Sequence, residues 1–193
     1  MTRIIAGSVG GRRIHTPPGN GTRPTSDRVR EALFSRLEHL EVLHEARVLD
    51  LYAGSGALGL ECSSRGAAFV TLVESARPAA VVARRNVKEL GLHGVDVRAD
   101  TVERVLRSGP PLDAKVDLVL ADPPYPVTQE SLGEVLRLLV AHDWLVDEAL
   151  LVVERSTRSP EPLWPGGIEL IGPRRYGETT LWFAEAVGEG DIA

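Results

Sequence analysis

A single cysteine, Cys62, occurs in this chain of 193 residues, and its five histidines are scattered. One cysteine excludes an internal disulfide framework and any metal site built from several cysteines, and no HExxH-like spacing is present. No apolar run approaches the roughly 20 residues that cross a bilayer, and the first residues, MTRIIAGSVGGRRIH, lack the apolar core of a secretory signal. We therefore expect a cytoplasmic protein with no metal ion and no membrane partner.

Positive charge is concentrated at the start of the chain. Residues 1–30 carry a net charge of +5, whereas the whole chain carries −5, so the remaining residues carry −10. A basic segment on an acidic body indicates a polyanionic partner such as nucleic acid. An arginine-rich solvated surface without any partner explains the same pattern. The arginines of this segment are Arg3, Arg12, Arg13, Arg23, Arg28 and Arg30.

Strand-like and helix-like patterns alternate along most of the chain. Residues 3–9 and 12–16 flank Gly10-Gly11 and predict a β-hairpin with a tight turn, and residues 17–25 predict a linker. Ser26 is placed to cap a helix. The apolar positions of that helix, which fall on one face, are Val29, Leu33, Phe34 and Leu37.

Seven apolar runs predict strands, and most of them are separated by helical patterns. These runs are residues 48–52, 69–74, 95–100, 116–121, 150–154, 168–172 and 179–185. The helices between them are predicted up to about Arg65, over 76–90 and 102–107, and after a cap at Thr128. Strands that alternate with helices form a parallel sheet covered on both faces, and near-continuous apolar runs suit strands buried on both sides.

The last two strands follow one another without a helix, so we expect an antiparallel pair at the sheet edge. The predicted fold is therefore an α/β, Rossmann-like sheet of seven strands, mostly parallel with an antiparallel C-terminal edge, plus the N-terminal β-hairpin. We expect three parts: a basic hairpin and linker (1–25), the α/β domain (26–186) and a frayed tail (187–193).

A glycine-rich stretch, GSGALG (54–59), follows the first strand of the alternating region and precedes a helix. Glycines let the backbone turn sharply and approach a ligand, and the helix N-terminus offers free N–H groups. Glu74 ends the next strand, where its carboxylate can accept hydrogen bonds from ribose hydroxyls. Asp100 ends the third strand, where it can accept from an adenine amino group. Together they predict an adenosine-containing ligand across the carboxyl ends of the strands.

NAD and S-adenosylmethionine both contain adenosine, and the glycine pattern alone does not choose between them. Asp50 places a negative charge beneath the glycine turn, which suits a methionine ammonium or sulfonium better than a pyrophosphate. Alternatively, Asp50 only fixes the loop by hydrogen bonds. We favour S-adenosylmethionine, for which the expected contacts are Asp50, Tyr52, Gly54, Ser55, Gly56, Glu74, Asp100 and Thr101.

The motif Asp122-Pro123-Pro124-Tyr125 follows the predicted strand 116–121. A nucleobase amine is a weak nucleophile because its lone pair is delocalised into the ring. The Asp122 carboxylate and the Pro123 carbonyl can accept hydrogen bonds from that amine and stabilise the charge that grows as it attacks a methyl sulfonium. Tyr125 can stack on a base removed from its strand. We predict that the four residues are catalytic, the alternative being an ordinary Pro-Pro turn.

DLYAGSG (50–56) together with DPPY (122–125) resembles the nucleic-acid amino-methyltransferases that use S-adenosylmethionine. Within that class, RIIAGSVGGRRI (3–14) followed by TRPTSDRVREALFSRL (22–37) resembles the bacterial 16S ribosomal RNA guanine-N2 methyltransferases, and the similarity extends from Arg3 to about Ala186. The resemblance implies methyl transfer to guanine N2 in small-subunit RNA that already carries ribosomal proteins. We also expect a monomer.

The resemblance supports the cofactor and catalytic residues named above, although Tyr52 stands where many methyltransferases have glycine. It implies that the six N-terminal arginines face RNA, with Arg12 and Arg13 on phosphates. Alternatively, Asp27 and Arg30 only support the start of the helix. Three other functions stay open: N6-adenine methylation of DNA, NAD-dependent oxidation, and RNA binding without catalysis. The 193 residues show no separate target-recognition domain, which argues against a sequence-specific DNA enzyme. The intact DPPY motif argues against a protein that only binds RNA.

Overall fold

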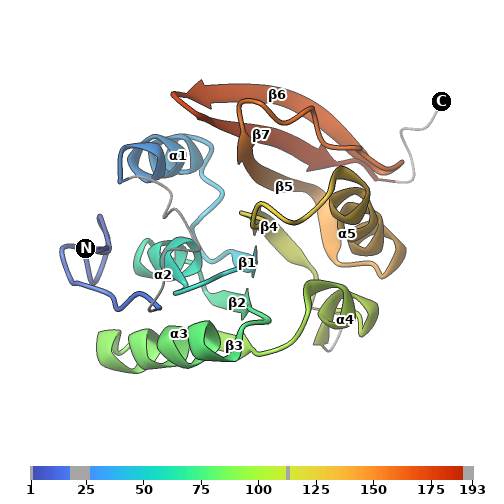
Figure 1. Ribbon diagram of the computed structural model, residues 1–193. Coiled ribbons are helices and arrows are strands. Elements are labelled where there is room, and N and C mark those ends of the chain that lie inside the picture. Colours follow the sequence, from blue (N-terminus) through green and yellow to red (C-terminus); the bar gives the residue numbers. More distant parts are fainter. Residues whose placement is uncertain (1, 18–26, 112–113, 189–193) are drawn as a thin grey trace.

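The computed structural model describes residues 2–17, 27–111 and 114–188. The strands are β1 (Arg47–Leu51), β2 (Phe69–Val73), β3 (Val95–Arg98), β4 (Val116–Ala121), β5 (Leu145–Ser156), β6 (Ile168–Tyr176) and β7 (Thr179–Ala186). The helices are α1 (Asp27–His39), α2 (Ala57–Ser64), α3 (Arg77–Leu90), α4 (Val102–Arg107) and α5 (Gln129–Ala141). The strands form one sheet, with α1, α2 and α3 on one face and α4 and α5 on the other (Figure 1).

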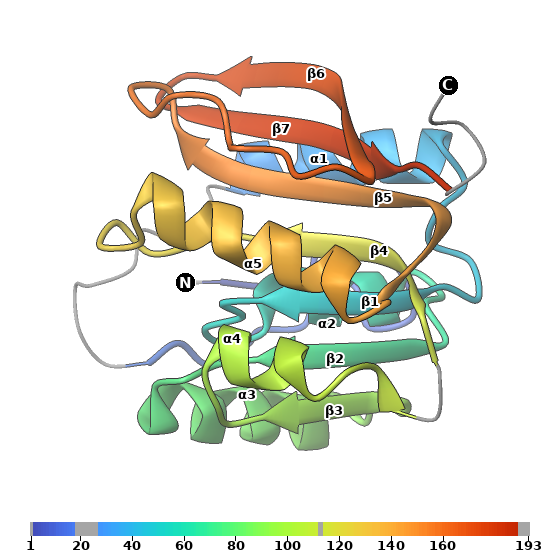
Figure 2. The same ribbon diagram turned by 90° about the vertical axis from the view of Figure 1, so that its right-hand side faces the viewer.

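The strand order is β3-β2-β1-β4-β5-β7-β6, and the first five strands in this order are parallel. β7 pairs antiparallel with both β5 and β6, so the C-terminal edge is a hairpin added to a parallel sheet. In Figure 2 the arrowheads of β1, β3 and β5 point the same way and that of β7 points the opposite way. The predicted seven-stranded α/β sheet with an antiparallel C-terminal edge is confirmed.

Each face of the sheet has its own apolar core. Leu118 and Leu120 of β4 pack with α1, α2 and α3, whereas Val119 and Ala121 pack with α4 and α5. Successive side chains of a strand point to opposite faces, so a strand buried on both faces needs a continuous apolar run. Asp50 is a polar exception within β1, and its side chain is buried.

The carboxyl ends of the parallel strands meet at one edge of the sheet. Leu51, the last residue of β1, is in register with Val73 of β2 and with Ala121 of β4, and Val73 is in register with Arg98 of β3. The segments that follow these residues are therefore neighbours in space. They are the segments in which the sequence analysis placed the cofactor and catalytic residues.

The N-terminal segment 2–17, which we call the arm, lies on the outer side of α2 and α3 (Figure 1). One antiparallel bridge, Arg3 with Arg13, joins its two limbs. Gly7 and Gly11 adopt positive φ values of 83° and 80°, and a Cβ at Gly7 would lie 2.0 Å from the Ser64 carbonyl oxygen. Gly11 N donates to the Ile4 carbonyl at 2.8 Å, so the chain reverses over residues 5–10 and the reversal is wider than the predicted Gly10-Gly11 turn. The cap at Ser26 lies outside the described residues.

Within those residues, no helix is both long and apolar enough to span a membrane. Nor does the described part of the chain bring together three or more His, Cys, Asp or Glu side chains that could hold a metal ion.

Candidate active site

The glycine loop, residues 52–56, connects β1 to α2. Tyr52, Gly54 and Gly56 adopt positive φ values of 62°, 56° and 84°, a region that glycine enters without steric cost. A Cβ at Gly59, in the first turn of α2, would lie 2.3 Å from the Leu72 side chain. The first two glycines therefore shape the loop, and Gly59 lets α2 pack closely on β2.

Glu74 fixes the glycine loop from the end of β2. One carboxylate oxygen accepts a hydrogen bond from Gly54 N at 2.8 Å, and the other accepts from Ala76 N at 2.7 Å. Each carboxylate oxygen can accept more than one hydrogen bond. The half-buried side chain thus shapes the loop and keeps capacity to accept further hydrogen bonds, and its contact with a ribose stays a prediction.

Asp50 lies beneath the glycine loop and is only 1% exposed. Its Oδ2 accepts a hydrogen bond from Gly59 N at 2.9 Å. Burial raises the pKa of Asp50 to about 7, the Gly59 N–H group opposes this rise, and the negative charge of Glu74 adds to it. The carboxylate holds the start of α2, as the alternative interpretation of this residue required, and its contact with a cofactor stays a prediction.

Asp100 and Thr101 follow β3. Asp100 accepts a hydrogen bond from Thr101 N at 2.9 Å, and its side chain is 40% exposed. The Thr101 hydroxyl caps α4 by accepting from Arg104 N at 3.3 Å. These local bonds leave Asp100 at the surface of the strand-end edge, where the sequence analysis placed an adenine contact.

The DPPY motif leaves β4 at the same edge. Asp122 N donates to the Leu51 carbonyl at 3.5 Å, which holds the motif beside the start of the glycine loop. Pro123 is buried, whereas the Tyr125 side chain is 74% exposed. Core packing does not account for so exposed an aromatic ring, which is free to stack on a flat ligand.

Arg155, at the end of β5, was not predicted from the sequence. Its guanidinium donates to the Val127 carbonyl at 3.3 and 3.4 Å and so holds the segment after the DPPY motif. Burial and the charge of Glu103 raise the pKa of Tyr52, and the charge of Arg155 opposes them. Tyr52 of the glycine loop and Arg155, which holds the segment after the DPPY motif, are therefore close enough to interact electrostatically. In the sequence, only the position of Arg155 directly after the apolar run 150–154 could have indicated that it lies near the strand-end site.

The structure separates the N-terminal arginines into two groups. Arg30 is buried, and it donates to the Arg3 carbonyl at 2.9 Å and to Asp27 at 2.7 Å, as the helix-supporting alternative required. Arg12 donates to the Leu90 carbonyl at 3.0 Å and to the Glu89 carbonyl, at the end of α3. Arg3, Arg13 and Arg28 are exposed. Arg23 lies outside the described residues.

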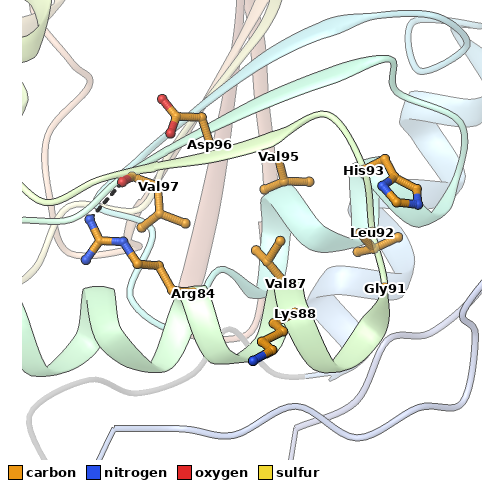
Figure 3. A pocket seen from close by; sticks show the side chains of 9 residues that line it. All are labelled: Arg84, Val87, Lys88, Gly91, Leu92, His93, Val95, Asp96 and Val97. Carbon is orange, nitrogen blue, oxygen red and sulfur yellow. Dashed lines mark hydrogen bonds between the residues drawn. The ribbon is translucent and has the colours of Figure 1, made fainter.

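An open hollow of about 410 Å³ lies between α3 and β3 (Figure 3). Apolar side chains, among them Val87, Leu92 and Val95, line its middle, and Arg84 donates to the Val97 carbonyl at 3.0 Å at one end. The hollow extends around the start of β3, whereas Asp100 follows the end of that strand. It is therefore not part of the strand-end site.

Known proteins match nearly the whole chain. A family model described as Conserved hypothetical protein 95 matches residues 2–185. Ribosomal RNA small subunit methyltransferase D of Escherichia coli strain K12 is 37% identical over 192 residues, which cover 98% of this chain and 93% of that protein. The chain belongs to this methyltransferase family. The Haemophilus influenzae protein of the same name is 33% identical over 164 residues, covering 82% of this chain and 80% of that one.

Solved structures agree with this membership. The yhhF protein from Escherichia coli superimposes with a TM-score of 0.84 at 35% identity, covering 96% of this chain and 98% of that one. A hypothetical protein from Thermus thermophilus gives a TM-score of 0.78 at 30% identity, covering 95% and 98%. The family similarity therefore includes the arm as well as the sheet.

Proposed function

We propose that this protein transfers a methyl group from S-adenosyl-L-methionine to the exocyclic N2 of a guanine in small-subunit, 16S, ribosomal RNA. The observation that carries the proposal is the meeting of the glycine loop and the DPPY motif at one acidic edge of the sheet, in a chain of this family. The names of the relatives support ribosomal RNA as the substrate. The choice of guanine N2 rests on the resemblance of segments 3–14 and 22–37.

The strand-end edge fits the cofactor in shape and in charge. The positive-φ turn at Gly54 and Gly56 allows a ligand to approach the backbone closely. Glu74 and Asp100 are suited to the ribose hydroxyls and the adenine amine. Tyr52 and Ser55 belong to the glycine loop, and Thr101 follows Asp100 in the chain. The acidic edge, which includes Asp50, complements a cationic ligand and disfavours the pyrophosphate of NAD. When bound, the cofactor supplies an electrophilic methyl group on a positively charged sulfur.

The protein's own part in the reaction is to hold the amine. The Asp122 carboxylate and the Pro123 carbonyl accept hydrogen bonds from the two N–H groups of the guanine amine and orient its lone pair toward the methyl group. Positive charge grows on the amine nitrogen as it bonds to the methyl group, and the two acceptors stabilise this charge. The methylated nitrogen then loses one proton to the carboxylate or to water. Pro124 stiffens the turn, and Tyr125 stacks on the base, which must leave its helix.

We further propose that the exposed Arg3, Arg13 and Arg28, with Arg23, bind phosphates and position the RNA without reading its sequence. Arg12 and Arg30 act less directly, because their guanidinium groups hold the arm against α3 and α1. The substrate would be an assembled or partly assembled small subunit in the cytoplasm, and the enzyme would act as a monomer.

Labelled methyl transfer tests this function. The protein is incubated with S-adenosylmethionine carrying a labelled methyl group and with unmethylated small-subunit RNA, both naked and in particles, and nucleosides are identified by mass spectrometry. We expect labelled N2-methylguanosine. Labelled N6-methyladenosine would overturn the guanine assignment but keep the role of the DPPY motif. Cofactor binding without labelled nucleosides would overturn ribosomal RNA as the substrate.

The Asp122→Ala variant tests the role of the DPPY motif. Loss of one preorganised acceptor should lower turnover by about a hundredfold or more while S-adenosylhomocysteine binds normally. Asp147→Ala is a matched control, because Asp147 is an exposed aspartate near the start of β5. Unchanged turnover in Asp122→Ala would contradict the mechanism.

A further inference from the structure

Asn86 of α3 links the arm directly to the glycine loop. Its side chain is 1% exposed. Oδ1 accepts a hydrogen bond from His15 N at 2.8 Å, and Nδ2 donates to the His15 carbonyl at 2.9 Å and to the Ser55 carbonyl at 3.0 Å. His15 belongs to the arm, and Ser55 lies between the two glycines of the loop. One buried amide therefore bridges the segment predicted to bind RNA and the loop predicted to bind the cofactor.

The Asn86 amide has little capacity to adapt if either partner moves. A carboxamide has two N–H donors, and both are used, one on each side of the bridge. Displacement of the arm or of the loop leaves a buried polar group without its partner. Such a loss changes an equilibrium constant by about 5- to 150-fold. The arm and the loop are therefore most stable when both hold the positions seen here.

The arm is fastened to α2 as well. Ile5 N and Ala6 N donate to the two carboxylate oxygens of Glu61 at 2.7 and 3.0 Å, and the Ser64 hydroxyl donates to the Ala6 carbonyl at 2.6 Å. The Glu61 side chain is fully buried, and α2 begins at the glycine loop. These contacts hold the arm on the helix that follows the loop, and Asn86 connects the arm to the loop itself.

We propose that Asn86 is a positioning residue that couples the two ligands, so that RNA held by the arm strengthens cofactor binding at the glycine loop. RNA on the exposed Arg3 and Arg13 would restrict the arm and, through His15 and Asn86, the Ser55 carbonyl. A cofactor that meets an already ordered loop loses less conformational entropy on binding. Thermodynamic linkage requires the cofactor to strengthen RNA binding by the same factor. The RNA part of this inference rests on the proposed function, whereas the positioning of the loop does not.

Equilibrium dialysis with radiolabelled S-adenosylhomocysteine tests the coupling, because this demethylated analogue of the cofactor permits no turnover. Dissociation constants are measured with and without saturating unmethylated small-subunit particles, for the wild type, Asn86→Ala and Asn86→Asp. Asn86→Asp keeps the size of the side chain but turns an oxygen toward the two carbonyls that Nδ2 contacts. Glu89→Gln is the control, since Glu89 contacts the His15 ring at 2.7 Å without contacting Asn86.

For the wild type we expect the particles to lower the dissociation constant at least about fivefold. Without particles, both Asn86 variants should bind the analogue about five- to tenfold more weakly. Their dissociation constants should then hardly change when particles are added, whereas Glu89→Gln should behave as the wild type. Circular dichroism and a particle-pelleting assay establish that each variant folds and binds RNA.

A full shift retained by both folded Asn86 variants would overturn the coupling, as would a wild type that binds particles without any shift. If the wild type binds no particles, the proposed function fails instead. In that case the RNA-free measurement still decides the positioning role, because unchanged analogue binding in both Asn86 variants would overturn it.

Discussion

Replacing Asp50 by asparagine should raise the stability of the protein above neutral pH and flatten its dependence on pH. Burial raises the pKa of Asp50 from its ordinary value of 3.8 to about 7 in the folded protein. Between these two values the unfolded chain has lost a proton that the folded protein still holds. The stabilising contribution of Asp50 is therefore present below pH 3.8 and is lost as the pH rises toward 7.

The size of the effect follows from the separation of the two pKa values. About three pH units at 1.36 kcal/mol each give a total of about 4 kcal/mol. Somewhat more than half of this, about 3 kcal/mol, falls between pH 5 and pH 8, because part of the loss has already occurred at pH 5. An asparagine keeps an oxygen that can accept from Gly59 N, and it does not titrate, so its contribution should not change over this range.

Urea unfolding of both proteins at pH 5 and pH 8, at one ionic strength and without cofactor, measures this difference. Titrating groups that do not interact with Asp50 affect both proteins equally and cancel in the comparison, whereas Glu74 and Cys62, which interact with its charge, cancel only in part. The free energy of unfolding of Asp50→Asn relative to the wild type should rise by about 3 kcal/mol between the two pH values. Equal changes in the two proteins would show that Asp50 keeps an ordinary pKa when folded, and would refute this account of the buried carboxyl group.

Two further predictions concern ligand binding. Glu74→Gln should weaken S-adenosylhomocysteine binding about tenfold in calorimetry, because an uncharged amide accepts hydrogen bonds less strongly than the carboxylate; a change below about twofold would contradict a contact with the ribose. Arg13→Ala should weaken RNA binding and reduce by about one the slope of log K against log salt concentration, as expected for one lost phosphate contact. Filter binding at several salt concentrations measures this slope, and the control Arg137→Ala on α5 should keep the wild-type value. A wild-type slope in Arg13→Ala as well would show that Arg13 does not contact phosphate.

The order of the elements could be predicted because both faces of the central strands are covered. The apolar run 116–121 coincides with β4, and the prediction for 102–107 coincides with α4. The cap at Thr128 is confirmed, since its hydroxyl accepts from Ser131 N. In each case the signal is local, being either a run of side chains that must avoid water or a single hydrogen bond within one turn.

The ends of the longer strands could not be predicted in this way. β5 begins at Leu145 and β6 ends at Tyr176, beyond the apolar runs 150–154 and 168–172. Several of the additional residues are exposed. The strand conformation of residues 155–156 and 173–176 comes from ladder pairing with β7, and such pairing leaves no apolar pattern in the sequence.

The hydrogen-bond partners of individual polar side chains could not be predicted either, because they are distant in the sequence. The carbonyls that Arg12 contacts are 77 and 78 residues away, and the glycine-loop carbonyl that Asn86 contacts is 31 residues away. An arginine reads the same in a sequence whether it faces phosphate or the end of a helix. The positive charge of residues 1–30 could therefore be recognised, but not its division into exposed and anchored arginines.

Buried polar residues on α2 and α3 explain why the arm packs on the helices that support the glycine loop. A buried polar group is costly unless it is hydrogen-bonded, and Glu61 and Asn86 are both buried on helices that cover the sheet. Their recorded partners include backbone groups of the arm at Ile5, Ala6 and His15. Without the arm these two side chains would lose those partners, and the apolar Ile4 and Ile14, which belong to the same core as α2 and α3, would be lost from it. Under the proposed function, RNA bound to the arm would therefore act on the surface that supports the glycine loop.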